Sequence, residues 1–389
     1  MNAKLLALAF GPLAFGLSGF AFVGLIDPMA ADLNESVAVI GQLQAAFFIA
    51  CGIGGPFVAR ATGGFDRKRL LLWVIAGMAA MNAVSAIANS FEAIVFARLV
   101  GGVFAALTLP VASTIAVGLV DEAKRPKAIA IVLGGYTFAF LLGIPVATAL
   151  GDWLGWRAAF WLASVSGMVA LGITLLAVPS EGSAPSAISA SFKAALVEQN
   201  PKLLLISLIG FTATFTTVSF IGPIITAVTS LEGAAIGAVQ ISTGVGSLLG
   251  LSAGAYLARF PLRYSLAFCM TVAAITQAAF SLGMFNDLGV LAIPSVIAII
   301  IFGSGAMFAT NPIVQTELAR SSGPAATIAF ALNSSMIYLG QGLGAVCGGL
   351  VIAFGSLSWT GFAGAVLAVF ATMAVASIKR RPQGQSVRS

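Results

Sequence analysis

Residues 128–150 read AIAIVLGGYTFAFLLGIPVATAL, a run of 23 residues without a charged side chain. About 20 mostly apolar residues suffice for a helix to cross the hydrocarbon core of a bilayer, which is roughly 30 Å thick. Backbone N–H and C=O groups find no hydrogen-bond partner in lipid, so a spanning segment of this kind is expected to be helical. This stretch therefore predicts a transmembrane helix.

Eleven further runs of the same kind occur along the chain. Hydrophobic residues make up 59% of the sequence and charged residues 8%, whereas a soluble domain averages about 25% charged residues. The chain is thus predicted to be an all-α membrane protein with twelve transmembrane helices. The expected spans are 5–27, 36–59, 70–90, 93–119, 128–150, 157–178, 203–229, 234–258, 264–284, 289–316, 323–352 and 359–378.

The Lys and Arg residues predict the orientation, because cytoplasmic loops carry an excess of both. With the N-terminus in the cytoplasm, all of the 19 Lys and Arg residues except Arg98 and Arg157 fall on the cytoplasmic side. We therefore expect a multi-pass protein of a bacterial cytoplasmic (inner) membrane with both termini inside. The net charge of +6 is explained by this topology, and nucleic-acid binding is not expected because no basic patch stands apart from a span end.

Metal and cofactor chemistry find no support in the residues. The chain has no His, and its three cysteines, Cys51, Cys269 and Cys347, all fall inside predicted spans, where they are expected to pack. A membrane-embedded enzyme needs clustered His, Asp, Glu or Cys. We therefore predict a protein that is not an enzyme and that uses no metal or cofactor.

Six spans fall in residues 1–180 and six in 202–389, which ends in a short tail expected to be cytoplasmic. Residues 181–201 lie between them, are rich in Ser, Ala and Pro, and are predicted to form a cytoplasmic linker. A weak repeat relates the halves, because Asn82 and Gln277 occupy matching places 195 residues apart. Two pseudo-symmetric six-helix halves are therefore expected.

Four segments carry motifs: GPFVARATGGFDRKRL at 55–70, RLVGG at 98–102, GGYTFAFLLGIPVATALGDWLGWR at 134–157, and ALNSSMIYLG at 331–340. Together they resemble the major facilitator superfamily, and more narrowly its twelve-span drug:proton antiporter branch, near the arabinose-efflux and purine-efflux permeases. The resemblance extends over nearly the whole chain. It implies the major facilitator fold, two halves that rock around a central site, and a monomer.

Segment 55–70 resembles the loop between spans 2 and 3 of that family. Asp66 can pair with Arg67, with Arg69 or with a helix end, and such a latch would hold the halves together on the cytoplasmic side. The alternative is a plain positive-inside anchor. The segment departs from the commonest family pattern, because Arg60 stands near the place where an Asp is usual.

The segment at 134–157 resembles the Gly/Pro motif of antiporters. Pro145 within the span frees a backbone carbonyl and bends the helix, so Gly143 and Pro145 are predicted to act in gating. Glycines also concentrate between Gly340 and Gly349 of span 11. These glycines either pack helices closely or let the helices that line a cavity flex and slide.

Arg98 resembles the arginine of the family's RxxxG segment and is a candidate for proton coupling, since a charge buried in a membrane is costly. Glu92 and Asp27 are its possible partners, and the alternative is a side chain that reaches the outer interface. Related permeases often carry a Glu in span 1, where this chain has Gly19. Asp27 is the best substitute, as a proton acceptor or as an exposed end-cap acid.

The substrate cavity is expected to be polar but nearly uncharged. Four phenylalanines lie on spans that are candidates to line it, namely Phe138, Phe140, Phe211 and Phe215. Amides, hydroxyls and aromatic rings suit a neutral or amphipathic organic compound. The candidate substrate-binding residues are Gln42, Asn82, Tyr136, Thr137, Thr214, Gln240, Gln277, Asn311, Asn333 and Tyr338.

The predicted function is secondary active export of small neutral or amphipathic organic compounds, of drug, sugar or nucleobase type, by proton antiport with alternating access. An exporter of this kind would confer multidrug resistance. The alternative is an uncoupled or uptake carrier of the same fold, which the absence of a carboxylate near any span centre would favour. The expected partners are a small-molecule substrate, protons and the lipid bilayer.

Overall fold

The computed structural model describes residues 3–62, 64–179, 196–197 and 199–378, and all regular structure in these ranges is helical. Twelve helical segments in this part of the chain are long and apolar enough to cross a membrane, which confirms the predicted fold class. The first group comprises α1 (Ala3–Phe20), α2 (Ile26–Leu33), α3 (Val37–Ala61), α4 (Arg67–Ile87), α5 (Phe91–Ala105), α6 (Thr108–Gly118), α7 (Arg125–Phe138), α8 (Ile144–Leu154) and α9 (Arg157–Ala177). The second group comprises α11 (Asn200–Val218), α12 (Ile221–Thr229), α13 (Ala234–Leu257), α14 (Leu262–Phe285), α15 (Ala292–Ser322), α16 (Ala326–Phe354) and α17 (Thr360–Ala376).

Four spans are interrupted, and each interruption lies about one turn before a proline. A proline inside a helix lacks an N–H group, and its ring clashes with the carbonyl four residues earlier. Pro28 follows the 3₁₀ turn Val23–Leu25, Pro110 follows the break between α5 and α6, and Pro223 follows the break between α11 and α12. Pro145 follows the π-helical turn Ala139–Gly143, which joins α7 to α8 without ending the span. The predicted bend at Pro145 thus takes the form of a π turn.

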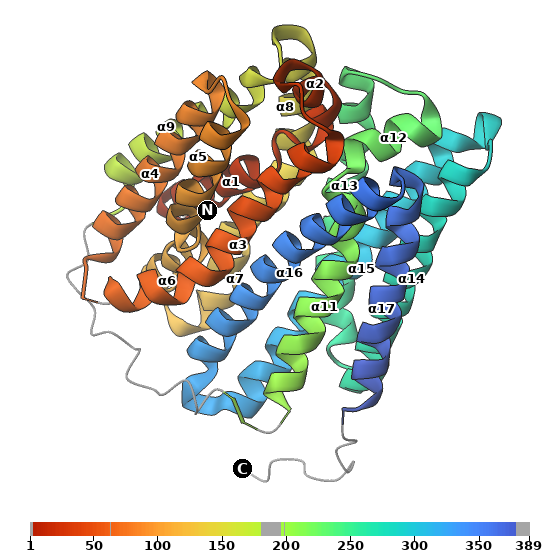
Figure 1. Ribbon diagram of the computed structural model, residues 1–389. Coiled ribbons are helices and arrows are strands. Elements are labelled where there is room, and N and C mark those ends of the chain that lie inside the picture. The colour runs from red at the N-terminus through yellow and green to blue at the C-terminus, as the bar shows by residue number, and fades with distance from the viewer. Residues whose placement is uncertain (1–2, 63, 180–195, 198, 379–389) are drawn as a thin grey trace.

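The two groups of helices stand side by side in Figure 1, with α1–α9 in red to yellow-green and α11–α17 in green to blue. They meet along two helix pairs, α3 with α16 and α8 with α13. At one end of the bundle, α2 of the first group also contacts α12 of the second. Residues 180–195, which form most of the predicted linker, lie outside the described residues, so the domain boundaries stay a prediction.

Small residues permit the closest helix contacts. Gly246, Gly250 and Gly254 recur every fourth residue on α13 and lie against α15, where an added Cβ atom would come within 2.0, 2.3 and 2.4 Å of the neighbouring atoms. This is the small-xxx-small spacing by which helix backbones approach each other in lipid. Gly237 and Gly244 lie on another face of α13, against the backbone of Pro145 and Leu141. Glycines on α13 therefore support both packing within the second group and contact between the groups.

The described basic residues gather at one end of the helices, called the basic end here. Arg60 ends α3, Arg67 begins α4, Arg125 begins α7 and Arg320 lies in the last turn of α15. Arg157 lies at the opposite end, where its Nη1 atom is 2.7 Å from Oδ2 of Asp32. Lys193, Lys379, Arg380, Arg381 and Arg388 lie outside the described residues, and the side of the membrane that the basic end faces stays a prediction.

Candidate functional site

A cavity of about 50 Å³ lies between the two groups of helices. Ligand pockets usually measure roughly 300–1,000 Å³, so an organic substrate would require the groups to move apart. The first group contributes only apolar side chains, namely Phe20, Val23, Phe140 and Ile144. All polar side chains that line the cavity come from the second group: Thr214, Gln240, Thr243, Gln277 and Ser304.

Both glutamine side chains in the cavity are bonded through their oxygen atoms. The hydroxyl of Thr148 on α8 donates to Oε1 of Gln240 on α13 over 2.9 Å, so this bond joins the two groups. The hydroxyl of Thr217 on α11 donates to Oε1 of Gln277 on α14 over 2.8 Å, within the second group. Both glutamines are buried.

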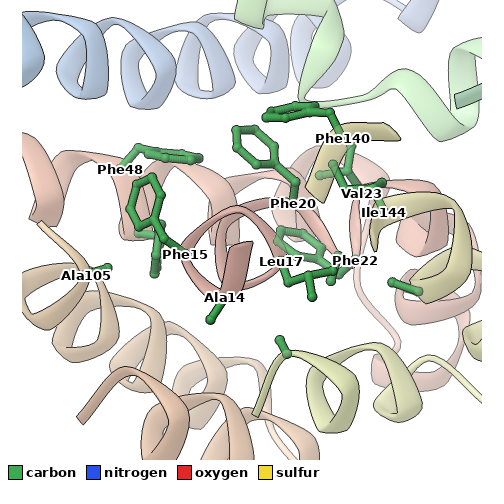
Figure 2. Packing of buried hydrophobic residues seen from close by; sticks show 14 of the residues in the cluster. Ala14, Phe15, Leu17, Phe20, Phe22, Val23, Phe48, Ala105, Phe140 and Ile144 are labelled. Carbon is green, nitrogen blue, oxygen red and sulfur yellow. The ribbon is translucent and has the colours of Figure 1, made fainter. Parts of the chain in front are cut away.

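Aromatic side chains cluster beside the cavity, where Figure 2 shows Phe20 and Phe140 next to each other and Phe15 and Phe48 close by. The ring centroids of Phe20 and Phe140 are 4.8 Å apart, and those of Phe20 and Phe48 are 5.1 Å apart. Such distances are typical of favourable aromatic pairs. The apolar wall of the cavity is therefore built from packed rings.

A second set of rings crosses between the groups. The centroid of Tyr338 lies 5.7 Å from that of Phe15 and 6.2 Å from that of Phe48, and Tyr136 lies 6.5 Å from Phe308. Phe15 comes one to two turns before the cavity residue Phe20 on α1, and Tyr136 comes one turn before the cavity residue Phe140. Both helices start at the basic end, so Phe15 and Tyr136 lie nearer that end than Phe20 and Phe140. These rings therefore lie on the side of the cavity that is nearer the basic end.

The structure places three of the ten predicted substrate-binding residues on the cavity: Thr214, Gln240 and Gln277. Tyr136 and Tyr338 belong to the rings on the basic side of it. The other five are buried or half-buried away from the cavity: Gln42, Asn82, Thr137, Asn311 and Asn333. All of these except Thr137 form side-chain hydrogen bonds to another helix.

Asn82 and Asn333 show what those bonds do. Asn82 on α4 donates to the Ser18 hydroxyl of α1 over 2.7 Å, and Asn333 on α16 accepts from the Ser207 hydroxyl of α11 over 2.7 Å. The bond between Asn82 and Ser18 joins the first and third spans of its group, as the bond between Gln277 and Thr217 does in the second group. Thr137 bonds only to a carbonyl of its own helix, that of Leu133.

Arg98 is buried at 2% exposure and binds the end of another helix. Its guanidinium donates to the carbonyl oxygens of Ser18 and Gly19 at the C-terminus of α1, and to that of Leu43 on α3. Carbonyls in the last turn of a helix lack partners within it, and a cation there is favoured by the helix dipole. The Arg98 side chain also lies over Phe47, 4.3 Å from the ring centroid. These contacts explain how a charge is tolerated in this position.

The predicted partners of Arg98 lie apart from it. Glu92 is exposed in the first turn of α5, and Asp27 is exposed in the first turn of α2. No ion pair with Arg98 occurs within the described ranges. The arrangement that links Asp27, Glu92 and Arg98 in proton coupling stays a prediction.

The predicted gating residues lie at two places. At the basic end, the Asp66 carboxylate accepts from the backbone N–H of Arg69 over 2.8 Å and so caps α4. Among the residues that the structure describes, no ion pair joins Asp66 to Arg67 or Arg69. Of the predicted partners, the helix end is therefore the one that Asp66 uses in this conformation.

Gly143 packs against its own group of helices, whereas Pro145 lies against the second group. Gly143 ends the π turn, and a Cβ atom added to it would come within 2.9 Å of Leu17. The carbonyl of Pro145 lies 2.8 Å from the place that a Cβ atom on Gly237 would occupy. A change in the π turn would therefore alter the contact between α8 and α13.

Sequence reasoning missed two polar cavity residues, Thr243 and Ser304, and the role of Thr148. Thr243 lies three residues after Gln240 on α13, so helical spacing places both on one face. Ser304 lies beside Gly303 on α15, in a run of apolar residues, where a lone hydroxyl is more often bonded to its own helix. No spacing rule connects Thr148 with Gln240, because they belong to different groups of helices.

Comparison with known proteins agrees with this architecture. The sequence model of the Major Facilitator Superfamily matches residues 8–328. The inner membrane transport protein YdhP of Escherichia coli is 26% identical over 386 residues, which cover 98% of each chain. A chloramphenicol resistance protein of Streptomyces lividans is 35% identical over 258 residues, which cover 65% of this chain and 66% of that one.

Solved structures share the fold at lower identity. A bacterial homologue of the human lysosomal transporter Spinster, in an inward-facing and occupied conformation, superimposes with a TM-score of 0.76 over 98% of each chain at 16% identity. The nucleoside transporter NupG gives a TM-score of 0.72 over 97% of this chain and 99% of its own, at 15% identity. This chain therefore belongs to the major facilitator superfamily, and it is a multi-pass membrane transporter of small solutes and not an enzyme.

Proposed function

We propose that the protein exports uncharged or amphipathic organic compounds from the bacterial cytoplasm in exchange for protons. The observation that carries this proposal is the cavity between the two groups of helices, which no charged side chain lines. A charged substrate would bind there without a counter-charge, at a large cost in hydration free energy. An uncharged substrate loses much less hydration free energy when it leaves water. The chloramphenicol resistance protein among the relatives supports export of an uncharged aromatic compound.

In this proposal residues 1–180 and 202–389 act as two halves that rock about the cavity, linked by residues 181–201. The basic end faces the cytoplasm, together with both termini, because of the positive-inside rule. The end that carries α2 and α12 then faces outward and is closed here by contacts between the halves. The predicted latch around Asp66, together with Gly143 and Pro145, would control the opening of the two ends.

Asp27 is the residue that we propose for proton uptake. It lies on α2 at the outer end, where α2 contacts α12 of the other half. A carboxylate that loses water when this end closes takes up a proton more readily, because burial disfavours its charged form. Arg98 and Glu92 would assist by holding α1 and α5 in place.

The test is transport into inverted membrane vesicles, with chloramphenicol, dyes, nucleosides and sugars as probes. The expected result is accumulation that requires a pH gradient and that a protonophore abolishes. Asp27→Asn should lose the dependence on the gradient, whereas Glu35→Gln at the same end should keep it. Full gradient-driven transport by Asp27→Asn would remove Asp27 from the proposal.

An uncoupled or uptake carrier is the second candidate. It is favoured by the absence of an acidic partner for Arg98 within the described ranges and by the exposed positions of Asp27 and Glu92. Saturable movement of a probe that ignores the pH gradient would select this candidate.

A further inference from the structure

The two cavity glutamines have their oxygen and nitrogen atoms in different surroundings. Oε1 of Gln277 accepts from Thr217 and lies 2.6 Å from the place that a Cβ atom on Gly364 would occupy, so the missing side chain leaves room for the carboxamide. Oε1 of Gln240 accepts from Thr148 and lies 3.1 Å from the corresponding place on Gly24. Both oxygen atoms are therefore turned toward neighbouring helices.

The amide nitrogen atoms of the two cavity glutamines, Nε2 of Gln240 and Nε2 of Gln277, have no hydrogen-bond partner in the described part of the protein. The amide of Gln44 is likewise unpaired but is fully buried in protein, whereas these two side chains line the cavity. A carboxamide carries two N–H donors on its nitrogen. The threonine hydroxyls thus orient two NH₂ groups so that their donors are available to whatever occupies the cavity.

The opposite wall offers no polar group. Phe20 and Phe140 face the cavity from the first half, with their ring centroids 4.8 Å apart (Figure 2). Aromatic and aliphatic surface on this side favours an apolar or aromatic part of a ligand. The cavity is consequently one-sided, with hydrogen-bond donors on one wall and rings on the other.

We propose that the transported compounds are uncharged, carry an aromatic or apolar face for Phe20 and Phe140, and present hydrogen-bond acceptors such as carbonyl oxygens to Gln240 and Gln277. This proposal rests on the function proposed above and names the substrate class of the same cavity. Compounds of the same shape without acceptors are rejected, because two buried NH₂ groups would then stay unpaired.

The two glutamines differ in when their donors are oriented. Thr217 and Gln277 belong to the same half, so this donor keeps its orientation as the halves move. Thr148 and Gln240 belong to different halves, so this donor is oriented only while α8 and α13 are in contact. An acceptor on the ligand is therefore bound more firmly when the outer end is closed.

The test measures binding of matched probes to the purified full-length protein in lipid nanodiscs by calorimetry. The probes are 1,3- and 1,4-diacetylbenzene, which carry two carbonyl acceptors; the isopropyl analogues, which have nearly the same shape without acceptors; and terephthalate, which is charged. We expect at least one diacetylbenzene to bind at least tenfold more tightly than its isopropyl analogue, and terephthalate not to bind.

Variants assign this preference to the two side chains. Gln240→Met and Gln277→Met should each weaken diacetylbenzene binding about tenfold, equivalent to about 1.4 kcal/mol, and leave the isopropyl analogue unchanged. Gln315→Met changes a carboxamide on α15 that does not line the cavity and should have no effect.

Equal binding of the two probe types, or Met variants that bind diacetylbenzene as the parent does, would overturn the proposal. Comparison with the vesicle assay separates this from the proposed function. Transport of other compounds without a preference for acceptors leaves the function standing and removes the substrate class. Acceptor-selective binding without gradient-driven export keeps the substrate class and removes the antiport.

Discussion

Gln42 and Gln44 lie two residues apart on α3, yet only Gln42 is hydrogen bonded. Nε2 of Gln42 donates to the carbonyl of Ala38 over 3.1 Å and, across the interface between the halves, to that of Ala345 over 3.2 Å. Gln44 is fully buried, and neither its oxygen nor its nitrogen has a partner in the described part of the chain. The same side chain therefore has opposite energetic consequences at the two positions.

Replacement of these glutamines by leucine should change stability in opposite directions. An unsatisfied buried polar group costs about 1–3 kcal/mol, so Gln44→Leu should raise the free energy of unfolding by about that amount. Gln42→Leu removes two bonds and leaves the Ala345 carbonyl without this donor, so it should lower stability. Thermal unfolding of both variants in one detergent checks this, and shifts in the same direction would contradict it.

Arg98 is expected to be required as an arginine. Its guanidinium reaches three carbonyls on two helices, whereas the single ammonium of a lysine cannot reproduce that fork. Arg98→Lys should lower the melting temperature and reduce transport at least tenfold. Arg157→Lys provides the comparison, because its pair with Asp32 is partly exposed and such pairs contribute about 0–1 kcal/mol. Equal effects of the two changes would count against this role of Arg98.

Asp152 caps a helix of the other half, and its removal should open the outer end. Its Oδ2 atom accepts from the backbone N–H of Ala234 over 2.9 Å. The N-cap residue of α13 is Gly233, which has no side chain with which to cap the helix itself. Loss of a helix N-cap costs about 0.5–2 kcal/mol. Asp152 caps α13 only in the conformation in which the two halves are in contact, so losing the cap destabilises that conformation alone. Asp152→Ala should therefore shift the population toward an open outer end, whereas Asp152→Asn keeps an acceptor oxygen.

The readout for Asp152 is the rate at which a membrane-impermeant thiol reagent labels Val23→Cys from outside, in a chain without the native cysteines. Labelling should rise severalfold in Asp152→Ala and stay within about twofold of the parent in Asp152→Asn, since a shift of 1.4 kcal/mol changes a population ratio tenfold. An unchanged rate in Asp152→Ala would show that the cap does not hold the end closed.

Glycine substitutions should distinguish helix contacts from lipid-facing positions. A Cβ atom on Gly250 would come within 2.3 Å of the backbone oxygen of Gly305, whereas nothing lies within 4 Å of one on Gly172. Gly250→Ala should destabilise the protein by about 1–3 kcal/mol, because backbone cannot move aside cheaply. Gly172→Ala should be neutral or stabilise helix α9 by about 0.5–1 kcal/mol. Melting temperatures of the two variants, measured side by side, decide the matter.

The helical spans were predictable because their signal is local. Each span appears as a run of apolar residues, which by itself predicts continuous helices over 5–27 and 203–229. The effect of proline on helices also accounts for the interruptions that precede Pro28 and Pro223. The candidate site was predictable only in part. Amides at membrane depth are easily recognised, but Gln42, Gln44, Gln240 and Gln277 look alike in the sequence, and only their neighbours separate a cavity donor from a packing contact.

The sequence by itself determined that the chain crosses a membrane twelve times as helices, because an apolar run of about 20 residues satisfies its own backbone hydrogen bonds in lipid as a helix. It also determined the family, through motifs that each lie within one segment. Only the tertiary structure decided that Arg98 binds the end of α1 in place of an acid, and that Thr148 and Thr217 orient the cavity amides. Those pairs join residues 60 to 92 positions apart on separate helices, and their partners depend on how helices pack in three dimensions and not on spacing along one helix.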